Sequence, residues 1–142
     1  MGNEDQNKGS SWHKWDLHVH TRCTHLNKAY QCSEEEFIQK LCDNKIDCIG
    51  LTNYFKFNEE EFALKEKIEE SGIKVFYSLE VRLDYQNKED KCLDFHIIFS
   101  DEVSSDGIKR FLSNMKANVC GTEKKLADLE KDDFDKAVVN FD

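Results

Sequence analysis

Residues 14–25, KWDLHVHTRCTH, decide the fold, because their first half alternates apolar and polar side chains as a β-strand does. The alternation predicts that Asp16, His18 and His20 share one face of this strand. His25 follows in a predicted loop, so three of the 5 His in the chain lie close together in sequence. The segment therefore predicts both the first strand of a sheet and a functional site at its end.

Histidines at positions i and i+2 of a strand project in the same direction and can chelate one divalent ion. Imidazole together with carboxylate suits zinc, manganese or iron. Asp16 is then either a further ligand or the acceptor of a hydrogen bond from a ligating ring. The alternative is structural: one of His18 and His20 is exposed and the other is a hydrogen-bonded core histidine, while His25 is simply exposed.

The rest of the chain alternates between predicted strands and helices. Ser33 and Glu36 have the spacing of a capping box at a helix start, and Asn58 caps another helix that Gly72 ends. Residues 132–142 fit neither pattern. Strands are expected at 15–20, 46–55, 73–85 and 91–100, and helices at 33–45, 58–72, 104–116 and 122–131.

This order predicts a single α/β domain over residues 12–142, preceded by a polar flexible tail at residues 1–11. The sheet is expected to be either an α/β sheet with helices against it or part of a β/α barrel. The strands at 73–85 and 91–100 are separated by a short polar turn, so we expect them to pair as a hairpin. In such folds functional residues gather at the carboxyl ends of the strands.

Further polar side chains are expected at this rim. Asn53 and Tyr54 end the strand at 46–55, and Glu80 and His96 each lie within an apolar strand. A carboxylate in apolar surroundings is unfavourable unless it is paired or bound to a metal. Glu80 and His96 are therefore candidate polar groups of a site at this rim, together with Asn53 and Tyr54. The alternatives are that Glu80 pairs with a Lys or Arg on a solvated face, and that His96 bonds a backbone carbonyl in the core.

Composition narrows the classes of function. The chain of 142 residues has a formal net charge of −9, which argues against a broad electrostatic interaction with a nucleic-acid backbone. A phosphate-containing substrate stays compatible, because bound metal ions reverse the local field. No apolar run is long enough to cross a membrane, and the 6 Cys form no C-x-x-C pair. We expect a cytoplasmic protein with reduced thiols and no membrane partner.

Four stretches resemble, in order, motifs of the PHP domain, the polymerase and histidinol phosphatase superfamily. They are DLHVHT at 16–21, IDCIGLTNYF at 46–55, VFYSLEVRL at 75–83 and FHIIFSDEV at 95–103. The resemblance implies a distorted β/α barrel that holds several divalent metals and hydrolyses phosphoesters. It also implies that His18 and His20 bind one metal and that Glu80 bridges two. By the same resemblance, His25 and His96 bind the other metals.

The chain departs from that family's pattern in three respects. Asn53 and Tyr54 stand where the family has Asp and His, and Ser78 stands where it has the glycine before the bridging acid. The later histidine motifs have no counterpart, because His96 is the last histidine of the chain. The resemblance therefore leaves two alternatives: the chain is an N-terminal fragment of a longer protein with a truncated barrel, or its site is degenerate.

A closer likeness is to the N-terminal PHP-like region of TrlF-type AAA-like ATPases, which resemble components of bacterial phage-defence loci. This likeness implies a metal-binding domain coupled to an ATPase domain or partner, with a phosphate-containing or nucleic-acid substrate. Two alternatives stay open. One is an active metal-dependent phosphoesterase or nuclease, and the other is a non-catalytic structural or interaction module.

Overall fold

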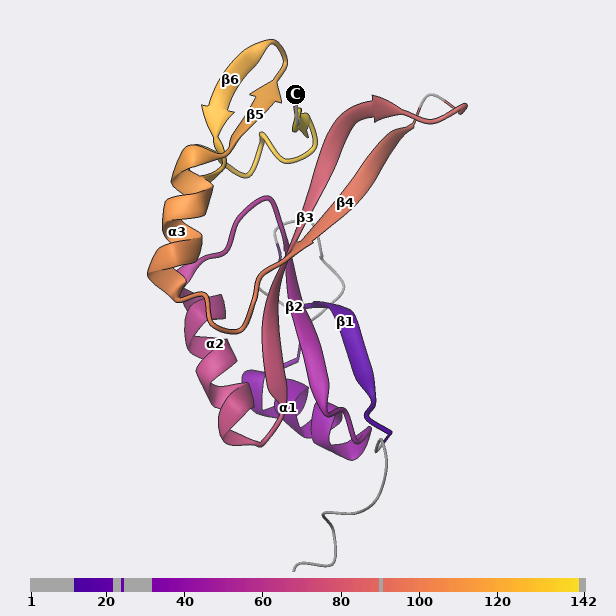
Figure 1. Cartoon of the computed structure of the whole chain (residues 1–142), viewed down its shortest axis with the longest axis vertical. Coiled ribbons are helices and arrows are strands. Elements are labelled where there is room, and N and C mark those ends of the chain that lie inside the picture. The colour runs from indigo at the N-terminus through magenta and orange to yellow at the C-terminus, as the bar shows by residue number, and fades with distance from the viewer. Residues whose placement is uncertain (1–11, 22–23, 25–31, 90, 141–142) are drawn as a thin grey trace, which may run out of the picture.

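A curled four-stranded sheet forms the centre of the computed structural model, which describes residues 12–21, 24, 32–89 and 91–140 (Figure 1). The fold is mixed α/β, and the sheet has the shape of half a barrel. The strand order is β1-β2-β3-β4, which follows the sequence. The predicted tail at residues 1–11 and the predicted ligand His25 lie outside the described residues.

The strands and helices of this layer confirm most of the predicted elements. The predicted capping box of Ser33 and Glu36 is present, and the predicted cap Asn58 forms a second box with Glu61. None of the helices in the described ranges is long and apolar enough to cross a membrane. The elements are β1 (Trp15–His20), α1 (Glu34–Asp43), β2 (Cys48–Tyr54), α2 (Glu59–Glu70), β3 (Lys74–Gln86), β4 (Cys92–Ile98) and α3 (Ser105–Asn114).

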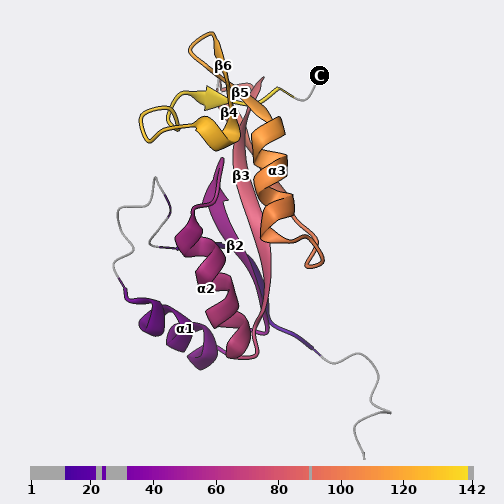
Figure 2. The same cartoon turned by 90° about the vertical axis from the view of Figure 1, so that its left-hand side faces the viewer.

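The helices pack on one face of the sheet. β1, β2 and β3 are parallel neighbours in sequence order, and crossovers of the same hand place α1 and α2 on the same face. Figures 1 and 2 show α2 and α3 along one side of the strands. The core lies between these layers, where Tyr77 of β3 packs against Phe57 and Phe62. Each large apolar side chain buried there stabilises the fold by about 1.5–3 kcal/mol.

The opposite face of the sheet, which we call the open face, is turned away from α1 and α2. Alternation along β3 places Val75, Tyr77 and Leu79 in the helix-covered core and Ser78 and Glu80 on the open face. β3 and β4 pair antiparallel, which confirms the predicted hairpin, and they extend past β2 as a two-stranded arm (Figure 1).

A β-bulge in β1 changes which residues reach the open face. Asp16 pairs with Ile49 and Val19 pairs with Leu51, so β1 has one extra residue in this interval. Asp16 is therefore in register with a residue of the helix-covered face, and its Oδ1 accepts a hydrogen bond from the backbone of His18 at 3.2 Å. The prediction that Asp16 shares a face with His18 and His20 was wrong, because strict alternation does not hold through a bulge.

Glycine is required opposite the bulge. A Cβ atom at Gly50 would lie 2.2 Å from the carbonyl oxygen of Leu17, which is closer than real contacts allow. Gly50 therefore lets the bulged backbone of β1 approach β2.

The C-terminal segment corrects one predicted helix. Residues 122–131 form β6 (Thr122–Lys125) and a short 3-10 helix (Leu126–Asp128), and β6 pairs with β5 (Lys116–Val119) in a second sheet with β7 (Ala137–Val138). Cys120 and Gly121 both have positive φ, which makes the two-residue turn that a hairpin favours. The turn and the strand pairing override the helix propensity of the Lys- and Leu-containing segment.

We predict that Gly50→Ala destabilises the protein by about 2–3 kcal/mol, because the added methyl group displaces the bulge. Chemical denaturation measures the change. The matched control is Gly72→Ala, where φ is +88° but no atom lies within 4 Å of the added Cβ. The control should cost about 1 kcal/mol through backbone strain alone. Equal effects of the two substitutions would contradict the role given to Gly50.

Candidate metal centre

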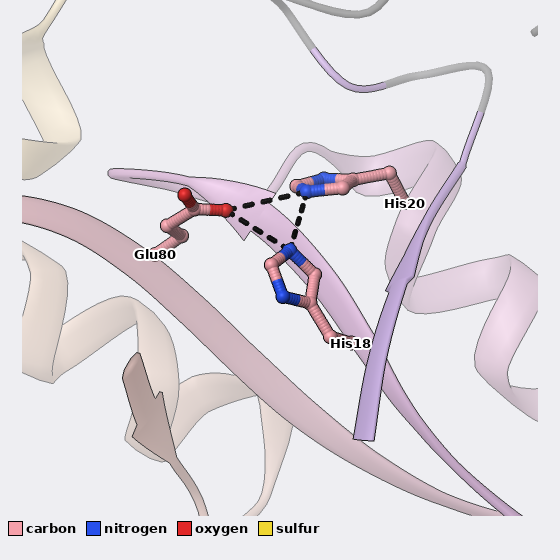
Figure 3. A group of neighbouring side chains, drawn as sticks. All are labelled: His18, His20 and Glu80. Carbon is pink, nitrogen blue, oxygen red and sulfur yellow. Dashed lines mark hydrogen bonds and ion pairs between the residues drawn. The ribbon is translucent and has the colours of Figure 1, made fainter. Parts of the chain in front are cut away.

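Three side chains converge on the open face at the carboxyl end of β1 (Figure 3). The Nε2 atoms of His18 and His20 lie 2.8 Å apart. Each lies 3.2 Å from Oε2 of Glu80 on β3. Both imidazole rings point toward Glu80, so the two strands on either side of β2 contribute to one group.

The pairing of the strands explains why these residues meet. Tyr54, Glu80 and His96 are in register across β2, β3 and β4, and their side chains form one row on the open face. The ring of Tyr54 stacks on that of His20 with centroids 4.8 Å apart, and the His96 ring lies 4.3 Å from that of His18. His96 Nε2 is 3.9 Å from Glu80 Oε2, so His96 borders the three-residue group.

Glu80 is buried without a full set of hydrogen bonds. Its side chain is 9% exposed, and the Oε2 atom has no hydrogen bond of good geometry within the described residues. Within those residues, the ion pairs of Glu80 are with histidine side chains. The nearby Arg82 pairs with Asp94 instead, with Nε 3.9 Å from Oδ1. The alternative in which Glu80 pairs with a Lys or Arg is therefore not what the structure shows. A buried carboxylate in this state favours a cation among its neighbours.

The donor set and its spacing fit a divalent ion. The three ligand atoms lie within 4.8 Å of one another. Metal–ligand bonds of about 2.0–2.2 Å in tetrahedral or octahedral geometry place neighbouring ligand atoms roughly 2.8–3.4 Å apart. The observed separations of 2.8 Å and 3.2 Å fall in that range. Imidazole nitrogen and carboxylate oxygen are both donors that metal ions accept in proteins.

Burial shifts the pKa values of two side chains at this site, His20 and Tyr54. Burial lowers the pKa of His20 from its ordinary value of 6.5, although the nearby Glu80 carboxylate acts in the opposite direction. His20 is therefore ready to act as a neutral ligand at neutral pH. Burial, followed by the charge of Glu80, raises the pKa of Tyr54, so its hydroxyl keeps its proton.

Asn53 does not join this group, although it precedes Tyr54. Its side chain faces the helix-covered side, where Nδ2 donates to both carboxylate oxygens of Glu61 at 2.6 Å. Glu61 was not identified from the sequence. The signal was present, because Glu61 lies three residues before Leu64 and seven before Ile68, on the buried stripe of α2.

The remaining site predictions have different outcomes. The structure brings together His18, His20 and Glu80, with His96 and Tyr54 at the border. Asp16 bonds the backbone of His18 instead of a ring nitrogen. His25 lies outside the described residues, so its predicted role as a ligand stays a prediction.

No family model, curated protein or solved structure matches the chain. The chemistry of the site is therefore the basis for inferring a function.

We predict that metal binding by this group weakens as the pH falls through the lowered pKa of His20, because protons then compete with the metal for its imidazole nitrogen. The dissociation constant should be nearly constant between about pH 7 and 8 and at least about tenfold weaker at pH 5. Titration calorimetry in several buffers measures both the affinity and the protons released. An affinity that is unchanged at pH 5 would contradict binding through His18 and His20.

Proposed function

We propose that the protein is a PHP-like metal-binding domain that holds one divalent ion, zinc, manganese or iron, between β1 and β3. The observation that supports this most strongly is the convergence of His18, His20 and the buried Glu80 carboxylate, with ligand atoms at 2.8 Å and 3.2 Å. Such an ion supplies Lewis acidity toward a phosphate oxygen and lowers the pKa of bound water. The substrate class that this chemistry suits is a phosphate-containing compound.

Several features support the proposed kinship with the PHP superfamily. The residues that the resemblance assigns as ligands on the first, third and fourth strands are neighbours in space. The curled sheet with α1 and α2 on one face is compatible with part of a β/α barrel. By the same kinship, we propose that the domain works with an ATPase domain or partner, as in TrlF-type proteins.

The second strand explains why we propose a single ion and weak hydrolysis. Tyr54 occupies the position in register with Glu80, and its raised pKa keeps a neutral phenol there instead of a ligand. Asn53 is bonded to Glu61 on the other face. Phosphoester hydrolysis by a two-metal clamp needs ions that stabilise both the attacking and the leaving oxygen. The described residues supply one three-residue ligand group.

The metal is tested by elemental analysis of protein that has been stripped with a chelator and reloaded with zinc or manganese. We predict one ion per chain in the wild type, and at least about 100-fold weaker binding after His18→Ala with His20→Ala. His13→Ala is the matched control, because His13 pairs with Asp47 away from the group. Circular dichroism should show that all three proteins are folded. Unchanged metal content in the double variant would rule out this site.

Activity is tested with a generic phosphodiester and the metal-loaded chain. We predict turnover near the uncatalysed background, well below the rate of about 1 per second that ordinary enzymes exceed. The control is Glu80→Gln, which should leave this low rate unchanged. Turnover at about 1 per second or faster that Glu80→Gln abolishes would show instead that the chain is an active metal-dependent phosphoesterase.

A further inference from the structure

A second acidic side chain, Glu61, is buried on the other face of the sheet, directly behind the metal group. Its exposed fraction is 0%. We propose that Glu61 is a positioning residue that fixes the ends of β1 and β2 and thereby holds His20 and Tyr54 in place. This inference rests on the proposed metal site and extends it to the buried layer that supports the ligands.

The contacts of Glu61 join three elements. Both carboxylate oxygens accept hydrogen bonds from Asn53 Nδ2 at 2.6 Å, which ties α2 to the end of β2. Oε1 accepts a longer bond from the Thr21 hydroxyl at 3.5 Å, at the end of β1. Oε2 accepts a bond from the backbone N–H of Asn58 at 2.9 Å. Every one of these partners donates, so an ionised carboxylate satisfies all of them.

The linkage to the metal group is direct along the chain. Thr21 follows His20, and Asn53 precedes Tyr54, so adjacent residues of each strand end point to opposite faces. The side-chain oxygen of Asn53 also accepts a bond from the backbone N–H of Tyr54 at 2.8 Å. Glu61 binds Thr21 and Asn53 on the helix-covered face of the sheet. These bonds therefore fix the backbone that carries the stacked rings of His20 and Tyr54 on the open face.

A role in helix capping alone does not explain this arrangement. Glu36 occupies the same position in the capping box of α1 and is exposed. Glu61 makes the equivalent capping bonds in α2, yet it is fully buried and bonded to both strand ends. Burial raises its pKa to about 7, which is an energetic cost that capping does not require.

The experiment compares cobalt binding by the full chain and its variants, using the visible absorption of the bound ion. In Glu61→Gln, the amide NH₂ faces the NH₂ group of Asn53, so one of the hydrogen bonds between the two side chains is lost. Cobalt binding should then weaken by about tenfold or more, as it does when residues that hydrogen-bond to metal ligands are changed. The absorption band should also change, because the ligand geometry relaxes. The matched control Glu36→Gln makes the same exchange of carboxylate for amide at the same capping position of α1, where the amide oxygen can still accept from the backbone of Ser33. It should leave both the affinity and the spectrum unchanged.

A rescue variant keeps the test informative if Glu61→Gln folds poorly. Asn53→Asp combined with Glu61→Gln exchanges the amide and the carboxylate across the same contact. We expect this double variant to regain most of the cobalt affinity and the wild-type spectrum, whereas Asn53→Asp alone opposes two carboxylates and should lose both.

Wild-type affinity and spectrum in Glu61→Gln would overturn the inference. So would a folded double variant that fails to regain binding. If the wild type itself binds no cobalt, the proposed metal site fails and the positioning role fails with it. Binding by the wild type with no effect of Glu61→Gln removes only the positioning role.

Discussion

The buried carboxylate of Glu80 needs positive charge or hydrogen-bond donors close to it, and the imidazoles on the open face of the sheet are placed to meet that need. β3 places this carboxylate between β2 and β4, in register with Tyr54 and His96. The two imidazoles that approach it come from β1, on the far side of β2. β1 has a bulge between Asp16 and Val19, and Gly50 leaves room for the carbonyl of Leu17 within it.

Much of the fold could be predicted from local sequence. The capping boxes at Ser33 and Asn58 depend on residues three positions apart, and the strands alternate or form short apolar runs. The bulge could not be predicted, because it depends on the approach of Leu17 to Gly50, which are distant in sequence. The β5–β6 hairpin was missed because the positive φ angles of Cys120 and Gly121 determine the turn, while the residues after it favour a helix.

The candidate ligands could be predicted from the sequence, but the contact between Asn53 and Glu61 behind them could not. His18, His20 and Glu80 stand out because polar residues interrupt apolar strands, and the structure brings them together. Asn53 looked equivalent to Tyr54 because both end the same strand, yet adjacent residues of a strand point to opposite faces. Its partner Glu61 belongs to a helix start, where an acidic residue is common. Glu80 and Glu61 therefore lie on opposite sides of one sheet. They differ in their partners, which are imidazoles for Glu80 and hydrogen-bond donors for Glu61.

The most direct test of this account is a crystal structure of zinc-loaded protein with anomalous diffraction recorded at the zinc edge. The account predicts one strong anomalous peak per chain on the open face, about 2.0–2.2 Å from Nε2 of His18, Nε2 of His20 and a carboxylate oxygen of Glu80. A peak at the cysteines or at surface carboxylates, with none among these three side chains, would contradict it.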